Sequence, residues 1–103
     1  MPLVSYKYMS TYKATIISPL GKIFENTVES LTAPGADGLF GVLARHAPMV
    51  KILGKGNIRL KGPGFEQIFA VDSGVLEVSQ KGEVLVFADN AVEENPSVQQ
   101  RVN

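Results

Sequence analysis

The sequence predicts an all-β fold, an antiparallel sandwich or barrel, on three observations. Ten Gly and six Pro are spread along the chain in short clusters, and these residues supply the backbone conformations that turns need. The clusters recur at intervals of about 8–16 residues, a spacing typical of sheets built from short strands. No segment shows the apolar periodicity of an amphipathic helix.

Three strands are predicted in the first half of the chain, where the residues between turns are strand-like. Tyr12–Ile17 opens the ordered part. Ile23–Thr32 is a longer run with a polar interruption. Leu39–Leu43 is a short apolar strand that follows the Gly-rich turn. Apolar and β-branched residues of this kind favour a pleated, half-buried surface.

Four more segments in the second half are predicted as strands. Ile58 and Leu60 alternate with polar residues, the period of two expected of a strand with one buried face. Ile68–Val71 and Val75–Ser79 flank the sequence Asp-Ser-Gly, so we expect them to pair as a hairpin. Val84–Ala88 is continuously apolar, which predicts a central strand buried on both faces.

The chain is predicted to be one domain, because its 103 residues lie in the usual size range of a single domain. Residues 12–91 are expected to form the β-sandwich. Residues 1–11 are expected to be an arm that is either disordered or an extension of an edge strand, since Tyr6, Tyr8 and Tyr12 alternate. Residues 92–103 are expected to be a short tail, for which a frayed terminus is favoured over a short docked helix.

Charge and residue usage exclude several functional classes. Ten Lys and Arg balance ten Asp and Glu, whereas nucleic-acid binders need a basic excess to replace counterions. With no Cys and one His, thiolate zinc sites, cysteine nucleophiles and multi-histidine metal centres are not available. No apolar run reaches the roughly 18 residues of a membrane-spanning helix, and the N-terminus lacks the apolar stretch of a signal peptide. We expect a soluble, intracellular domain that binds no nucleic acid, metal or cofactor.

No catalytic constellation is recognisable in the sequence. His46 has no carboxylate beside it in the chain, so we interpret it as a loop-shaping residue rather than a general base. The Gly-rich stretch 34–41 lacks the Lys-Ser/Thr ending of a phosphate loop and no helix follows it. We interpret it as a tight turn and a strand in which Gly41 tolerates close backbone approach. Binding or scaffolding is therefore favoured over catalysis.

A resemblance to a known family begins at this same stretch. Residues 34–43 read Pro-Gly-Ala-Asp-Gly-Leu-Phe-Gly-Val-Leu and are followed by His46-Ala47-Pro48, which resembles the signature of the ε subunit of F-type ATP synthases. Flanking segments resemble the family in the same order; they are residues 18–24, 28–31, 56–60, 69–78 and 84–91. Together these segments cover most of the predicted sandwich, so the resemblance is more specific than a single Gly pattern.

The resemblance implies an architecture and a role. The family's N-terminal domain is a flattened β-sandwich of two five-stranded antiparallel sheets. It is a non-catalytic rotor subunit of the central stalk that links the γ subunit to the c-ring and couples proton or sodium flow to ATP synthesis. It lies peripherally at the cytoplasmic face of the bacterial inner membrane, or at the stromal side of the thylakoid as the alternative.

The resemblance also implies two contact regions. Family positions that face the c-ring are matched by Ser18, Ala36, Asp37, Gly38 and Leu39. Family positions that pack towards γ are matched by Leu43, His46, Ala47, Pro48 and Met49.

Three departures from the family pattern qualify these expectations. Many relatives carry an acidic residue where Leu39 stands, so a different ring contact is expected here. Relatives usually have Pro-Gly at Ala44-Arg45, so the turn before His46 is expected to differ. The family commonly continues into a C-terminal α-helical hairpin that this sequence is too short to hold, so we expect hairpin-based inhibition to be absent.

One alternative class remains open on the residues, a free-standing β-sandwich module that binds small ligands or carbohydrate. Carbohydrate sites usually present exposed aromatic platforms, and this chain has no Trp. Binding to γ separates the two readings.

Overall fold

The computed structural model describes residues 10–94, which contain strands and turns and no helix. The strands are, in chain order, β1 (Tyr12–Ser18), β2 (Gly21–Val28), β3 (Ser30–Gly35), β4 (Gly38–Leu43), β5 (Met49–Leu53), β6 (Gly56–Gly62), β7 (Phe65–Val71), β8 (Gly74–Val78), β9 (Val84–Ala88) and β10 (Ala91–Glu94). The predicted all-β class is therefore confirmed. Nothing in residues 10–94 forms a helix long and apolar enough to cross a membrane.

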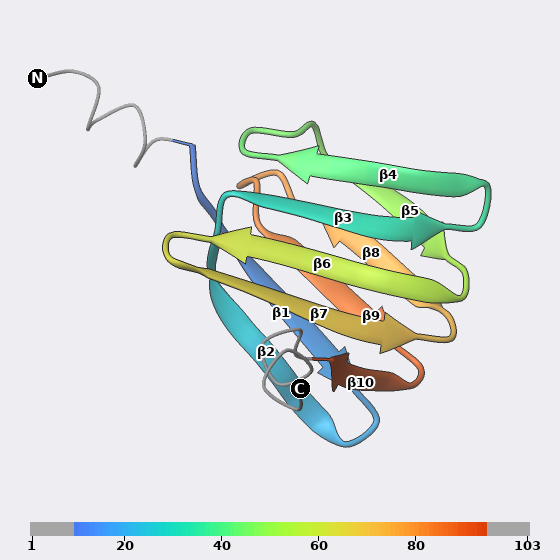
Figure 1. The fold of residues 1–103 in the computed structure, drawn as a ribbon. Coiled ribbons are helices and arrows are strands. Elements are labelled where there is room, and N and C mark those ends of the chain that lie inside the picture. The colour runs from blue at the N-terminus through green and yellow to red at the C-terminus, as the bar shows by residue number, and fades with distance from the viewer. Residues whose placement is uncertain (1–9, 95–103) are drawn as a thin grey trace, which may run out of the picture.

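The strands form one hydrogen-bonded sheet that is folded into two layers (Figure 1). One layer has the order β4-β3-β6-β7-β10 and the other has the order β5-β8-β9-β1-β2. A single residue pair, Gly35 with Leu53, joins β3 to β5 where the layers meet. The expected sandwich of two five-stranded layers is confirmed, with one parallel pairing, β1 with β9, among antiparallel ones. That pair is not joined by a hairpin, because most of the chain lies between its two strands, so a turn does not set its direction.

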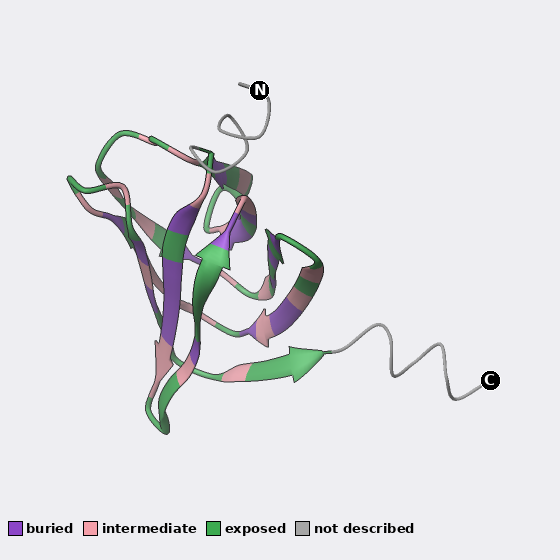
Figure 2. Cartoon of the chain, turned by 90° about the vertical axis from the view of Figure 1, so that its left-hand side faces the viewer, coloured by how far each residue is buried: buried purple, intermediate pink, exposed green. Residues whose placement is uncertain are grey.

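The core lies between the two layers and is made of aliphatic and aromatic side chains. Along β6, β8 and β9 buried residues alternate with more exposed ones, because successive side chains of a strand point to opposite faces. Buried and exposed segments lie side by side through the sandwich (Figure 2). Phe24 of β2 meets Phe69 of β7 edge to face, with ring centroids 5.7 Å apart. This contact joins the two layers through side chains, and each fully buried residue of this size contributes about 1.5–3 kcal/mol.

One buried polar contact also crosses the sandwich. The hydroxyl of Tyr12 in β1 donates a hydrogen bond to the backbone carbonyl of Val42 in β4. Burial raises the pKa of Tyr12 above its ordinary value, because the charged phenolate is disfavoured away from water. The hydroxyl is therefore held as a neutral donor between the layers.

The predicted hairpin of Ile68–Val71 with Val75–Ser79 is wrong. β7 pairs with β6 and β10, whereas β8 pairs with β5 and β9. The intervening residues carry the chain from one layer to the other, and a second crossing, from β9 to β10, lies beside them. The amide of Asp89 donates to the carbonyl of Ser73 at 2.9 Å, which ties the two crossings together. Turn residues such as Asp72-Ser73-Gly74 occur both in hairpins and in crossings between layers, so they do not predict which strands pair.

The long predicted strand Ile23–Thr32 is two strands in different layers. β2 ends at Val28 and pairs with β1, and β3 begins at Ser30 and pairs with β4 and β6. At the crossing the amide of Glu29 donates to the carbonyl of Lys61 at 2.7 Å. No Gly or Pro marks this crossing in the sequence, so the strand-like pattern of residues predicts a single strand across it.

Two strands were not predicted, and one boundary differs. β5 follows the His46 loop directly, and β10 lies partly in the segment expected to be a tail. Because β10 reaches Glu94, the sheet extends beyond the expected boundary at residue 91. The remaining tail, residues 95–103, and most of the expected arm, residues 1–9, lie outside the described residues.

Two further expectations fail in detail. Gly41 is not a point of close backbone approach, because a Cβ there would lie 3.7 Å from the Leu31 carbonyl oxygen, an ordinary contact. β9 is central in its layer but is not buried on both faces, since 48% of Phe87 is exposed.

Candidate functional site

The site residues predicted from the sequence lie at the ends of strands and in the connections between them. Among residues 10–94, no three His, Asp or Glu side chains lie together in a way that could hold a metal ion. His46 lies on a loop, where its Nδ1 is 2.8 Å from the carbonyl oxygen of Ala47. Its backbone amide donates to the Leu43 carbonyl at 3.2 Å. These contacts shape the loop and bring no acid, base or nucleophile to the imidazole.

The residues expected to face the c-ring lie on two turns at the same end of the sandwich. Ser18 begins the β1–β2 turn, where its hydroxyl accepts a hydrogen bond from the Leu20 amide at 3.1 Å. Residues 36–39 form the β3–β4 turn and the start of β4. Both turns lie at the end where β1 and β3 finish, as the β1–β9 and β3–β5 registers require. Leu20 and Leu39 are 95% and 79% exposed there.

The β3–β4 turn is tied to β5 by both backbone and side chain. The Ala36 amide donates to the Ile52 carbonyl at 3.0 Å. The Lys51 ammonium lies 3.6 Å from an Asp37 carboxylate oxygen and 5.3 Å from the centroid of the Phe40 ring. The turn therefore sits in a defined position relative to β5.

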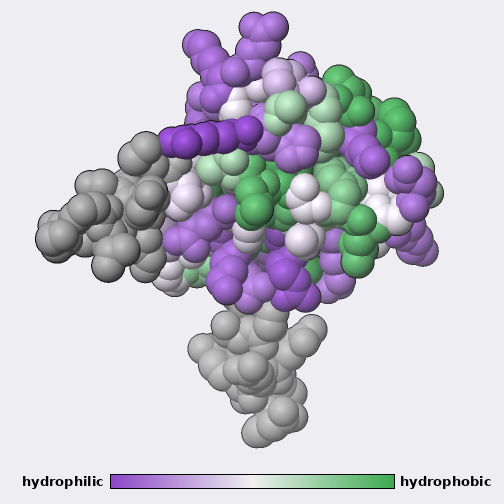
Figure 3. Space-filling view, turned by 90° about the horizontal axis from the view of Figure 1, so that it is seen from above, coloured by the Kyte–Doolittle hydropathy of each residue, from purple (hydrophilic) through white to green (hydrophobic). Residues whose placement is uncertain are grey.

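The residues expected to pack towards γ lie at the opposite end, on the connection from β4 to β5 (top of Figure 1). Leu43 and Pro48 are exposed, whereas Met49 is half-buried against the core. Arg45 has a positive φ of 66°, so this turn uses a left-handed backbone conformation that Gly adopts more easily. Seen from above, on the side that carries β4, hydrophobic side chains are gathered between hydrophilic ones (Figure 3).

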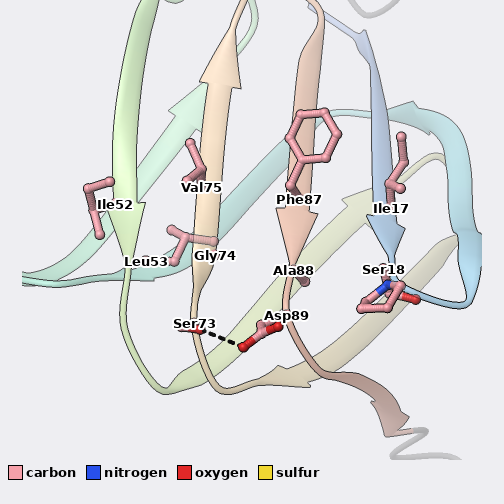
Figure 4. Close-up of a pocket in the computed structure, with 11 residues that line it drawn as sticks. Ile17, Ser18, Ile52, Leu53, Ser73, Gly74, Val75, Phe87, Ala88 and Asp89 are labelled. Atoms are coloured by element: carbon pink, nitrogen blue, oxygen red, sulfur yellow. Dashed lines mark hydrogen bonds between the residues drawn. The ribbon is translucent and has the colours of Figure 1, made fainter.

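The sequence reasoning missed an apolar feature on the outer face of the β5-β8-β9-β1 layer. Ile52, Val75, Phe87 and Ile17 are direct cross-strand neighbours in four successive strands. They point to the same side of the sheet (Figure 4). We call these four residues the apolar row.

The apolar row borders an open groove of about 600 Å³. Ile52 is 59% exposed and Phe87 is 48% exposed. Ser18 and Pro19 also line the groove, so the β1–β2 turn adjoins the apolar row as well as the end expected to face the ring. Exposed, contiguous apolar surface on a small domain is typical of interaction sites.

A sequence signal for this row existed in the continuously apolar run Val84–Ala88. The run was interpreted as burial on both faces within the chain, but its outward residue Phe87 is left exposed by the fold. Val50 and Ile52 on β5 are likewise apolar residues on the outer face, since both are exposed and alternate with more buried neighbours. An apolar residue on the outer face can serve a partner as well as a core.

The other half of the same outer face is charged. Glu25 of β2 forms ion pairs with Lys13, at 2.9 Å, and with Lys22. Hydrogen bonds from Lys22 and then Lys13 lower the Glu25 pKa from its ordinary value of 4.5 to about 2. A second hollow, of about 240 Å³, adjoins this group and is lined by Lys13, Thr15, Glu77, Ser79, Glu83, Val84 and Leu85.

Comparison with known proteins agrees with the fold and with the resemblance. The family described as "ATP synthase, Delta/Epsilon chain, beta-sandwich domain" matches residues 11–94. An ATP synthase epsilon chain from Rhodopseudomonas palustris (strain BisB5) is 40% identical over 83 residues, which are 81% of this chain and 61% of that relative. This chain thus spans about three fifths of that relative's length. An epsilon chain from Caulobacter vibrioides is 33% identical over 85 residues, which are 82% of this chain and 98% of the relative.

A solved structure shows the same fold at low sequence identity. A chain in the central stalk and c-ring structure of the Tetrahymena thermophila mitochondrial ATP synthase matches with a TM-score of 0.70 and 10% identity. The match covers 79% of this chain and 65% of that one. The family match does not favour the alternative of a free-standing ligand-binding module. The two-layer fold agrees with the family match over residues 11–94 and with these relatives. The chain therefore belongs to the ATP synthase delta/epsilon family and carries its β-sandwich domain.

Proposed function

We propose that this chain is a non-catalytic central-stalk subunit of an ATP synthase, linking a γ subunit to the c-ring and helping couple ion flow to ATP synthesis. The observation that carries the proposal is the apolar row, because a small sandwich that leaves four neighbouring apolar side chains on its outer face needs a partner to cover them. Family membership supports the identity of the complex. The location that follows is the membrane surface, reached through the complex, at the cytoplasmic face in a bacterium.

In this proposal the apolar row, with Val50 and Pro48 beside it, binds γ. Pro48 is exposed and leads into β5, so it continues the apolar surface towards the β4–β5 connection. The β3–β4 turn, with Asp37 and Leu39, binds the ring. Ser18 lies between the two surfaces, since it begins the β1–β2 turn and also lines the groove.

The test is the affinity of the purified chain for a γ subunit, measured by titration in solution. Phe87→Asp and Ile52→Asp each place a carboxylate in the apolar row, and we expect each to weaken binding by at least about tenfold, or ~1.4 kcal/mol. Val92→Asp is the matched control, because Val92 is 59% exposed on β10 of the other layer. Equal affinity of all variants would refute the proposed γ surface.

The coupling role has its own readout. An enzyme depleted of this subunit should regain ATP-driven ion pumping when the wild-type chain is added. Leu39→Asp should bind γ normally, because Leu39 lies on β4 of the other layer and does not line the groove beside the apolar row. It should restore less pumping if the β3–β4 turn meets the ring. Full restoration by this variant would remove Leu39 from the ring contact.

A further inference from the structure

Glu77 occupies an unusual position on the outer face that carries the apolar row. It points outward from β8, whose inward residues Leu76 and Val78 are buried. Its direct cross-strand neighbours are Val50 on one side and Leu85 on the other. A carboxylate thus stands between two apolar side chains, beside the apolar row.

The charged groups nearby leave this carboxylate without a partner in the described part of the chain. Both lysines of the charged half, Lys13 and Lys22, form ion pairs with Glu25, and Lys13 is also attracted by the charge of Glu83. No hydrogen bond or ion pair joins the Glu77 side chain to any residue between 10 and 94. Glu77 and Glu83 line the hollow of about 240 Å³, with Lys13 as its single cationic side chain. The hollow therefore has an excess of negative charge.

An exposed carboxylate carries no desolvation penalty while water solvates it. The same carboxylate carries a large desolvation penalty once a partner covers the face. A charge that leaves water without a counter-charge is strongly destabilising. Complementary charges across an interface remove that cost and set the register of docking. If the apolar row is covered, Glu77 is covered with it, since Val50 and Val75 adjoin it on the same face.

We propose that the partner docked on the apolar row inserts a basic side chain, Lys or Arg, into the hollow between Glu77 and Glu83. This inference rests on the proposed function, in which that partner is γ. The hollow is smaller than the roughly 300–1,000 Å³ of small-molecule sites, and it is open to the same side as the apolar row. Its size and charge fit the end of one cationic side chain, and its place beside Val50 and Leu85 makes that ion pair part of the apolar contact.

The experiment measures the affinity of the full chain for a purified γ subunit between ~20 and ~500 mM salt, over which the electrostatic screening length falls from about 20 Å to about 4 Å. Glu77→Gln should weaken binding by at least about fivefold and flatten its salt dependence, because the partner's cation loses its counter-charge. Glu77→Lys should weaken binding further, by about a hundredfold, through like-charge repulsion. Glu94→Gln is the matched control, since Glu94 is exposed on β10 of the other layer.

The outcomes separate this inference from the proposed function. If Phe87→Asp abolishes binding while Glu77→Gln binds as the wild type does, with the same salt dependence, the ion pair is refuted and the apolar γ surface stands. If the wild-type chain does not bind γ at all, both proposals fail. Circular dichroism of each variant checks that the fold is retained, which the exposure of Glu77 favours.

Discussion

The hydroxyl of Tyr12 lies 2.6 Å from the carbonyl oxygen of Val42, 30 residues later in the chain. The bond connects β1 of one layer to β4 of the other. β4 is an edge strand whose ladder partner is β3, so this side-chain bond is a second attachment for it. The position of β4, which carries Leu39 at one end and Leu43 at the other, therefore depends on a residue from the first strand.

Tyr12→Phe should lower the free energy of unfolding by about 1–3 kcal/mol, because the buried Val42 carbonyl loses its donor while the ring still fills its site. Urea unfolding followed by circular dichroism measures the change. Amide hydrogen exchange in β4 should rise more than in β9. An unchanged unfolding midpoint would mean that water or another donor replaces the hydroxyl.

Gly74→Ala should be strongly destabilising. A Cβ at Gly74 would lie 2.3 Å from the carbonyl oxygen of Phe87, so β8 and β9 would have to separate, at a cost of about 1–3 kcal/mol or more. Gly41→Ala is the control, since Gly41 is also in a strand but has only ordinary contacts around its Cβ position. Thermal unfolding should show a lower midpoint for the first variant and little change for the second. Similar midpoints for the two would contradict the close approach.

The Glu25 carboxyl should titrate near pH 2 at low salt, as followed by carbon NMR of its side chain. Its pKa is lowered from 4.5 to about 2 by Lys22 and Lys13. A lowered carboxyl pKa contributes stability that is present above the ordinary pKa of 4.5 and is lost as the pH falls through about 2. Because the pair is exposed, salt should raise the titration midpoint. Lys22→Met should raise it as well, and a midpoint unaffected by either change would exclude the ion pairs.

Arg45→Gly should stabilise the protein by about 0.5–1 kcal/mol. Arg45 has a φ of 66°, and this left-handed conformation costs a residue with a Cβ about 1–2 kcal/mol. Gly avoids that strain, but it offsets part of the gain because its unfolded chain has more conformational entropy. Arg45→Ala is the control, because it removes the charge and keeps the strained conformation. Equal stability of the two variants in urea would show that the effect comes from loss of the Arg45 side chain and not from relief of backbone strain.

Local sequence features predicted the strands well but not how the strands pair. Tyr12–Ile17 and Leu39–Leu43 differ from β1 and β4 by a single residue, because alternation and turn residues act within a few positions. The same rules placed a hairpin at residues 72–74 and a continuous strand through Glu29. Both positions are crossings between layers, where the choice of partner depends on strands far away in the chain.

The candidate surfaces divide in the same way. The resemblance implied which residues would face the ring and which would face γ. The structure brings Ser18 and residues 36–39 to one end of the sandwich and residues 43–49 to the other. The apolar row needed the structure, because Ile17, Ile52, Val75 and Phe87 come from four strands that meet only through their registers. No spacing within the chain marks them as neighbours.

By itself the sequence determined that the chain is an all-β domain without a cysteine or multi-histidine site, and which family it resembles, since composition, turn residues and motifs are local properties. The tertiary structure alone decided which apolar residues are covered. Val86 and Phe87 are adjacent and both apolar, yet Val86 is fully buried and Phe87 is 48% exposed, because the second layer packs against one face of β9 and not the other. The same one-sided packing leaves Glu77 on the surface that a partner would cover.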